Sequence, residues 1–319
     1  MRCFLCKKNN FEQIYTLETK KILRCRNDGL FLADATASHK NNVYKADYFD
    51  NPPHPQNSNR SYFLKKLEII KLITDNRKPK TLDIGCGWGD FEEILEQQKI
   101  PYLGIDINRE AIEICKKKGL NCHQESLNQL LNYKKQFTRN KKISKSKKTN
   151  SKNFNKLRFE NWNLFGKLGD CPPAGEAGNL EFDCITMFQL IEHLKNPIPM
   201  LKVAKKLLKK KGVVLITTPN NDSPLRKIFR TRWSVYNEPS HFVFYNNKSL
   251  EQTLNSAEFN NVRVSLDSWR FLTSKYILNR LIQIYPSSIF NLLTSNFQHL
   301  TFNIPTDPFG DLVTIALSS

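Results

Sequence analysis

Apolar positions along this 319-residue chain recur in two alternating patterns. Short runs rich in Val, Ile and Leu are typical of buried strands, and they alternate with stretches whose apolar residues lie three and four positions apart, as in amphipathic helices. The predicted strands are 81–85, 102–106, 120–124, 182–187, 213–218, 261–267 and 311–317, and the predicted helices are 62–74, 89–98, 109–118 and 198–210. This alternation predicts a doubly wound α/β domain with a seven-stranded, mostly parallel sheet.

Two segments do not follow this alternation. Residues 1–50 show little periodicity and carry three cysteines, so they are expected to form a small head. The Pro- and Asn-rich stretch 51–60 is expected to separate the head from a main domain over 60–319. Within that domain, residues 134–180 form a long aperiodic connection that is expected to be a disordered insertion.

The charge is concentrated in this insertion. The chain has 49 Lys and Arg against 30 Asp and Glu, a formal net charge of +19, and eleven of the basic residues lie between 134 and 158 without an acid among them. The insertion also contains Phe154, Phe159 and Trp162, so it has the residue types that grip RNA phosphates and stack on bases. Because no RNA-binding fold accompanies it, we favour a solvated loop.

The spacing of the cysteines and the apolar segments near the chain ends indicate the expected cellular location. The eight cysteines are not spaced as in a disulfide framework, and most fall in predicted buried strands or helices, which favours a reducing, cytoplasmic location. The N-terminus lacks the apolar stretch of a signal peptide. The most apolar late region is interrupted by Lys275 and Arg280, so no transmembrane helix is expected.

The strongest motif is the segment TLDIGCGWGD over 81–90, a strand that runs into a glycine-rich turn and a helix. Gly85 and Gly87 allow the backbone to approach a ligand closely, and Gly89 opens a helix whose amide groups face the site. Asp106 ends the next strand, where a carboxylate can accept both hydroxyls of a ribose. A dehydrogenase that binds NAD would share these features, but its third glycine would come one position later.

At these residues the sequence resembles the class I S-adenosylmethionine-dependent methyltransferases. The resemblance continues in order through FDCITMFQLIEHL over 182–194, KGVVLITTPN over 211–220 and EPSHFVFY over 238–245. The last segment is similar to that of ubiquinone-type O-methyltransferases and of methyltransferases of glycan and secondary metabolism. The resemblance implies methyl transfer to a small-molecule or glycan acceptor, at an oxygen atom.

The resemblance also implies roles for individual residues. The implied cofactor-binding residues are Asp83, Gly85, Cys86, Gly87 and Gly89 around the methionine part, Asp106 and Ile107 at the ribose and adenine, Ser126 and Leu127 beside the adenine, and Phe188 and Gln189 near the transferred methyl group. His241 is the preferred general base, although a histidine there can equally hold its loop in place. His193 is expected to anchor its turn with Glu192. Trp233 and Tyr236 are expected to line an acceptor pocket or to pack in the core.

The head has the spacing of a zinc ribbon in which one cysteine is replaced. Cys3 and Cys6 are followed by Cys25 and, three positions later, by Asp28. Related methyltransferases carry a four-cysteine version of this head, so Asp28, or less favourably His39, is expected to complete a structural zinc site. The alternative is a head that packs without metal.

Three further interpretations remain open from the sequence. Residues 44–49 are expected to form a lid over the cofactor, and the aromatic stretch 265–310 either caps an acceptor pocket or contacts a membrane surface peripherally. The rival functions are an RNA-binding methyltransferase, an NAD-dependent dehydrogenase and a noncatalytic S-adenosylmethionine-binding protein.

Overall fold

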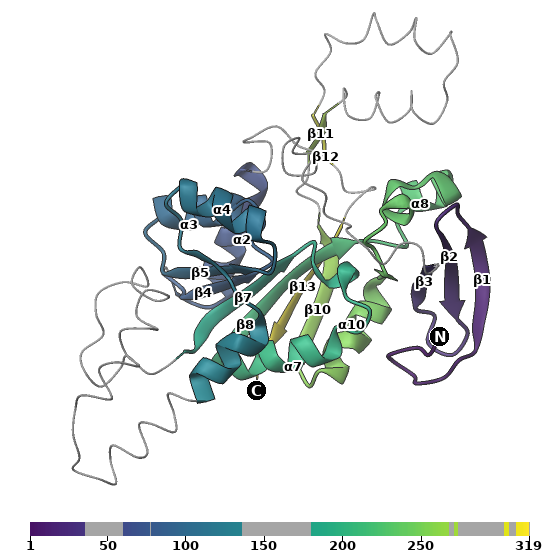
Figure 1. The fold of residues 1–319 in the computed structure, drawn as a ribbon, viewed down its shortest axis with the longest axis horizontal. Coiled ribbons are helices and arrows are strands. Elements are labelled where there is room, and N and C mark those ends of the chain that lie inside the picture. Colours follow the sequence, from purple (N-terminus) through teal and green to yellow (C-terminus); the bar gives the residue numbers. More distant parts are fainter. Residues whose placement is uncertain are drawn as a thin grey trace, which may run out of the picture.

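The computed structural model describes residues 1–35, 60–76, 78–135, 180–267, 271–273, 303–305 and 311–318 (Figure 1). Several predicted features lie outside the described residues. These are the lid over 44–49 and His39, the part of the basic insertion from 136 to 179 with its RNA-binding alternative, and most of the aromatic stretch 265–310.

A seven-stranded sheet forms the centre of the molecule (Figure 1). Its strands, in spatial order, are β10 (Asn260–Asp267), β13 (Asp311–Leu317), β8 (Leu208–Pro219), β7 (Phe182–Phe188), β4 (Thr81–Ile84), β5 (Tyr102–Asp106) and β6 (Cys122–Gln124). The five strands from β8 to β6 pair in parallel, and β13 runs antiparallel to both β8 and β10. The doubly wound, mostly parallel α/β fold is therefore confirmed.

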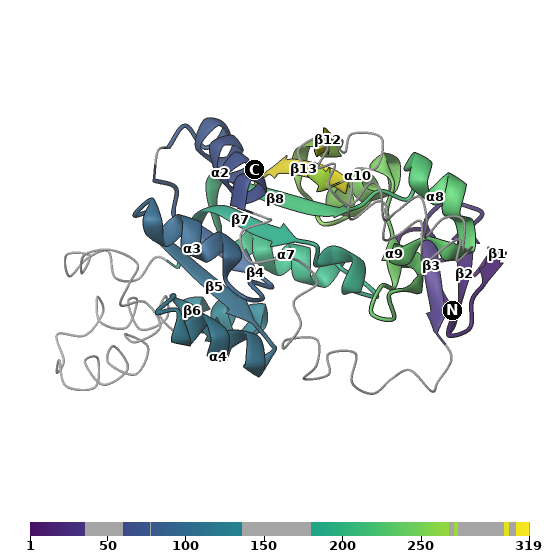
Figure 2. The same cartoon turned by 90° about the horizontal axis from the view of Figure 1, so that it is seen from above.

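Helices cover both faces of this sheet (Figure 2). They are α2 (Arg60–Ile73), α3 (Asp90–Gln97), α4 (Arg109–Lys117), α7 (Ile198–Leu207) and α10 (Asn247–Ser256), with a further helical run over 127–135. Neighbouring strand residues point to opposite faces. Thus Val214 and Ile216 pack with α7 and α10, whereas Leu215 packs with α2 and α3.

Local side chains explain where several helices begin. The Asn108 side chain accepts a hydrogen bond from the N–H of Ala111 and caps α4. Asn246 and Ser249 form a reciprocal capping box at the start of α10, which the sequence analysis did not predict. A proline at the first turn of α7 lacks an N–H group that would have had no helical partner.

The head is an antiparallel sheet rather than an irregular segment. Strands β1 (Phe11–Thr16), β2 (Lys20–Cys25) and β3 (Phe31–Ala35) are joined by β9 (Val243–Phe244), which comes from the main domain. Three short helical segments, α8 (Pro224–Phe229), η3 (Arg230–Arg232) and α9 (Ser234–Asn237), lie beside this sheet (Figure 2). The head and the main domain thus share one sheet, which the low periodicity of residues 1–50 did not indicate.

The remaining elements are small. A single turn, η2 (Ile191–His193), follows β7, and β11 (Phe271–Thr273) pairs with β12 (Asn303–Pro305). Each of the seven cysteines that the structure describes carries a free thiol. Within the described part of the chain, no helix combines the length and the apolar character needed to span a membrane.

Candidate cofactor and acceptor site

The glycine-rich turn connects β4 to α3 at the carboxyl edge of the sheet. Gly87 has a φ of +51°, and a Cβ built on it would meet no atom within 4 Å, so the space above it is open. Gly89 has a φ of +80°, and its Cβ would lie 2.5 Å from the Leu120 side chain. Glycine is therefore required at position 89 by packing and conformation, and at position 87 it leaves room for a ligand.

Asp106 lies directly beside this open space. Its carboxylate accepts hydrogen bonds from the N–H of Gly87 at 3.1 Å and from the N–H of Asn108 at 2.8 Å. Burial raises the pKa of Asp106, although these two N–H groups act in the opposite direction. The next residue, Ile107, is 77% exposed beside this turn. The two side chains suit a sugar hydroxyl pair and an aromatic base.

Asp83 lies one strand further in and is almost fully buried. It accepts a hydrogen bond of 2.5 Å from the Thr186 hydroxyl group. Burial raises the pKa of Asp83 to about 6, so the carboxylate is mostly ionised at neutral pH. No ion pair to Asp83 occurs among the described residues. A buried carboxylate in this position can hold a cationic ligand group.

The end of β7 contributes Phe188 and Gln189. Phe188 makes edge-to-face contacts with Phe63 of α2 and Phe91 of α3, with ring centroids 5.3 and 5.1 Å apart. Gln189 has a φ of +52° and donates a hydrogen bond of 2.9 Å to the Asp311 carboxylate. The structure thus holds Phe188 within an aromatic group and directs Gln189 toward β13.

His241 and His193 lie against each other beyond the ends of β7 and β8. Their ring centroids are 4.7 Å apart, and the Nδ1 atoms face the carbonyl oxygens of Val235 and Ser240. Burial, followed by the charges of His193 and Lys20, lowers the pKa of His241 to about 3. His241 is therefore neutral at physiological pH, and an Nδ1–H donor leaves the lone pair on Nε2. His193 contacts the loop at Ser240.

The remaining predicted site residues make local hydrogen bonds or are buried in the core. Ser126 is hydrogen-bonded to Gln129 at the start of the helical run over 127–135, and Leu127 is buried in the main core. Trp233 and Tyr236 are buried against the head sheet, and the Tyr236 hydroxyl group donates to the Asn221 side chain. These two aromatic residues form core between the head and the main domain.

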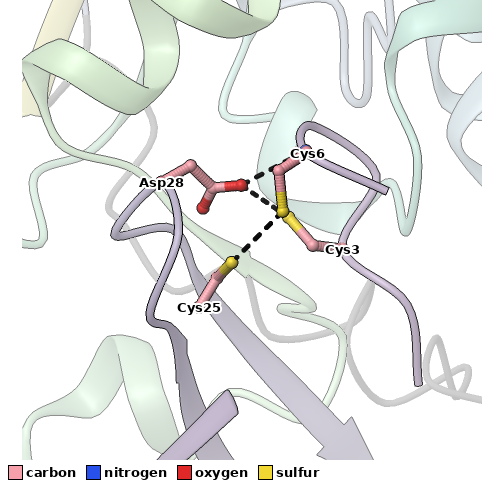
Figure 3. A group of neighbouring side chains, drawn as sticks. All are labelled: Cys3, Cys6, Cys25 and Asp28. Carbon is pink, nitrogen blue, oxygen red and sulfur yellow. Dashed lines mark hydrogen bonds between the residues drawn. The ribbon is translucent and has the colours of Figure 1, made fainter. Parts of the chain in front are cut away.

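The four predicted metal ligands converge in the head (Figure 3). We call Cys3, Cys6, Cys25 and Asp28 the head cluster; one ligand atom from each lies within 4.8 Å of all the others. The Cys3 thiol donates to Asp28 at 3.0 Å, and the sulfur atoms of Cys6 and Cys25 are 3.5 Å apart. Three sulfurs and one carboxylate oxygen form a donor set that suits a tetrahedral zinc ion.

The electrostatics of the head cluster follow from burial and hydrogen bonding. Burial raises the pKa of the Cys3 and Cys25 thiols. Burial acts in the same direction on Asp28, but hydrogen bonds from Cys3, from the N–H of Leu30 and from Cys6 outweigh it and lower the pKa of Asp28. The carboxylate is therefore ionised and already turned toward the sulfurs.

Two groups of functional side chains were missed by the sequence analysis. One is the polar cluster of Asp267, Asp311 and Lys66 at the carboxyl edge, and the other is a buried trio of cysteines behind the glycine-rich turn. A signal existed for Lys66, because it lies four residues from both Tyr62 and Ile70 on the buried face of α2. The other contacts join strands and helices far apart in the chain, and no local pattern predicts them.

Comparison with known proteins agrees with this geometry. A sequence profile of the methyltransferase-domain family matches residues 56–264. Two ubiquinone biosynthesis O-methyltransferases, from Pasteurella multocida and Haemophilus ducreyi, are 25% and 27% identical to this chain over 141 and 142 residues. The matched segments cover 44% of this chain and 46% and 45% of those proteins, so the chain spans only about half the length of these curated relatives.

A solved S-adenosylmethionine-dependent methyltransferase from Archaeoglobus fulgidus is 17% identical, with 80% of this chain and 94% of that chain covered and a TM-score of 0.44. A methyltransferase from Thermotoga maritima has the same TM-score at 15% identity, with 82% and 92% covered. The family match over more than half of the chain decides the assignment. The chain belongs to the S-adenosylmethionine-dependent methyltransferase family.

Proposed function

We propose that this protein transfers the methyl group of S-adenosylmethionine to an oxygen atom of a small-molecule or glycan acceptor. The observation that carries the proposal is the open position at Gly87, which faces the Asp106 carboxylate across a hydrogen bond of 3.1 Å. The names of the Pasteurella and Haemophilus relatives, which are O-methyltransferases, support oxygen as the acceptor atom.

The residues around the turn fit the cofactor. Asp106 would accept the ribose hydroxyls, and Ile107 would pack against the adenine. The buried Asp83 would face the cationic methionine part, with Gly85, Cys86 and Gly89 shaping the turn around it. Ser126 and Leu127 border the adenine side in this proposal, and Phe188 and Gln189 border the methyl side. When bound, the cofactor supplies a methyl group that is already activated by its sulfonium charge.

The task left to the protein is to hold the acceptor oxygen in line with that methyl group. In this proposal the acceptor lies beyond β7 and β8, where Gln189 and His241 border the same edge of the sheet. The neutral His241 accepts a hydrogen bond from the acceptor hydroxyl group through Nε2. Because its pKa is about 3, His241 orients and polarises the hydroxyl group, and the proton that this group loses on methyl transfer passes to solvent.

Cofactor choice is tested by calorimetric titration with S-adenosylmethionine, S-adenosylhomocysteine and NAD. We expect binding of the first two and none of NAD. Asp106→Ala should weaken that binding at least about 10-fold, because hydrogen bonds to a charged group contribute roughly 1.5–3 kcal/mol. The exposed Glu110→Ala is the matched acidic control and should bind as wild type does. Binding of NAD instead would refute the proposal.

The acceptor is identified by incubating a cell extract with the protein and an isotopically labelled methyl donor, followed by mass spectrometry of labelled compounds. We expect the label on an oxygen atom of a small molecule or glycan. Label on RNA that disappears when residues 136–160 are deleted would favour the RNA alternative. Cofactor binding without any labelled product would instead indicate a noncatalytic binding protein.

We also propose that the head cluster binds a structural zinc ion. Its support is the convergence of four ligand atoms within 4.8 Å and the ionised Asp28 (Figure 3). Asp28→Cys should tighten zinc binding by restoring four thiolate ligands, whereas Asp28→Ala should weaken it. Metal content after dialysis against a graded series of chelator concentrations distinguishes these outcomes, and equal zinc retention by all three proteins would refute the assignment.

A further inference from the structure

A second group of cysteines lies on the far side of the glycine-rich turn from the open space. Cys86 comes from the turn, Cys115 from α4 and Cys122 from β6, and their sulfur atoms lie within 4.8 Å of one another. All three residues are buried, with exposed fractions of 7%, 0% and 2%. We call these three residues the buried cysteine cluster. It is separate from the head cluster, which lies in another sheet.

The carboxyl group of Glu92 lies near Cys122 of this cluster. A Cβ built on Gly104 of β5 would lie 2.8 Å from the Cys122 sulfur, 2.9 Å from a Glu92 carboxyl oxygen and 3.1 Å from the Cβ of Cys86. The sulfur and the oxygen therefore both border a position that has no side chain. Glu92 is fully buried, and neither of its oxygens meets hydrogen-bond geometry with any residue that the structure describes.

The surroundings of this carboxyl group are rich in negative charge. Burial, followed by the charge of Asp83 and a side-chain interaction with it, raises the pKa of Glu92. Among the described residues, Lys118 pairs with Asp90 and Glu93 on the surface, but no ion pair reaches Asp83 or Glu92. A buried acid without a cationic partner shifts its pKa and becomes neutral. Glu92 is therefore a neutral acid beside the Asp83 carboxyl group.

We propose that the buried cysteine cluster binds one divalent cation of the zinc type. Thiolates are ligands that zinc accepts, whereas magnesium and calcium require oxygen ligands. Ligation converts the thiols to thiolates and releases their protons to solvent.

The position of the site links it to the cofactor turn. The Cys115 thiol lies 3.3 Å from the carbonyl oxygen of Gly87, to which it donates a hydrogen bond. An ion held by all three cysteines would tie the turn to α4 and β6. The site thus adjoins the proposed cofactor site, with which it shares Cys86.

The test separates the two cysteine groups by substitution in the full-length chain. One variant has alanine at the three cysteines of the head cluster, and a second has Cys115→Ala and Cys122→Ala. Cys184→Ala is the matched control, because Cys184 is a fully buried thiol in the same sheet and belongs to neither group. Each protein is stripped with a chelator and titrated with zinc against a chromophoric indicator, and circular dichroism monitors folding.

We expect the head variant to retain one tightly bound zinc ion per chain, and Cys184→Ala to bind the wild-type amount. The Cys115→Ala, Cys122→Ala variant should bind one ion fewer than wild type. The proposal is wrong if the head variant binds no zinc, or if the double variant binds as much as wild type.

A second measurement does not depend on the folding of the double variant. Cobalt(II) is added to the stripped head variant, in which the buried cysteine cluster is intact. Absorption in the near ultraviolet from thiolate-to-cobalt charge transfer, with visible bands of tetrahedral intensity, is the expected result. A spectrum that is the same as that of cobalt in buffer would overturn the proposal.

Discussion

Asp267→Asn should destabilise this protein more than any loss of a surface charge. Asp267, at the end of β10, lies 2.5 Å from the Lys66 ammonium group of α2, and both side chains are 0% exposed. The ammonium group also lies 4.7 Å from the centre of the Tyr62 ring. The pair therefore joins a helix on one face of the sheet to an edge strand without access to water.

The size of the effect follows from this burial. Removing one partner of a buried ion pair leaves the other charge without full compensation and costs about 3–5 kcal/mol. Replacing both partners with apolar residues of similar volume removes the charges together and costs much less. Asp267→Asn and Lys66→Met should each lower the free energy of unfolding by about 3 kcal/mol or more. The double variant Lys66→Met, Asp267→Leu should recover most of this loss.

Thermal and urea unfolding of the four proteins measure the two single effects and how much stability is recovered when both charges are removed. At about 2–4 °C per kcal/mol, each single variant should melt at least about 6 °C below wild type. Glu113→Gln is the control, because it breaks the Arg109–Glu113 pair, whose side chains are 78% and 52% exposed, and should leave the midpoint unchanged. A single variant that melts with wild type, or a double variant that melts below both singles, would refute the reasoning.

Three further predictions concern the site. Gly89→Ala should destabilise the fold by about 1–3 kcal/mol, because its Cβ would lie 2.5 Å from the Leu120 side chain at a φ of +80°; Leu120→Ala should relieve part of the loss in urea unfolding. Asp83 binds its proton up to about pH 6 when folded, against an ordinary pKa of 3.8, so wild type should lose stability relative to Asp83→Asn as the pH rises from about 4 to 6. A stability difference that is constant across this range would contradict the assignment. His241→Gln should lower kcat about 10-fold or more but keep the shape of the pH–rate profile between about pH 5 and 8, because the pKa of His241 is about 3. Loss of an inflection in that range would show that His241 titrates there.

The sequence predicted the central sheet well because its strands are short apolar runs buried on both faces. The pattern at 213–218, for example, corresponds to the second half of β8, where every residue is buried. The glycine-rich turn and Asp106 were also brought together as expected, since consecutive parallel strands end at the same edge. At this turn the local sequence pattern and the topology of the fold predict the same contact.

The sequence-based predictions failed where a structural element depends on residues that are far away in the sequence. The strands of the head alternate weakly, and one of its four strands is supplied by Val243–Phe244 from the other end of the chain. Lys66 was assigned to a helix, but a lysine is normally exposed, and its buried partner lies two hundred positions away. The buried cysteine cluster combines a turn, a helix and a strand, so the cysteine spacing alone gave no signal for it.

These contacts also give the head a role in arranging the acceptor side. The buried ammonium group of Lys20 in β2 donates to the carbonyl oxygens of Glu238 and His241 at 2.5 and 3.1 Å. β3 pairs with β9 immediately after His241, and Ala33 donates to the carbonyl oxygen of Phe242. Because the segment before β9 is held in part by the head, a change that loosens the head should displace His241 from the carboxyl edge. Metal binding at the head cluster would then affect methyl transfer more strongly than cofactor binding, since Gly87 and Asp106 belong to the other end of the sheet.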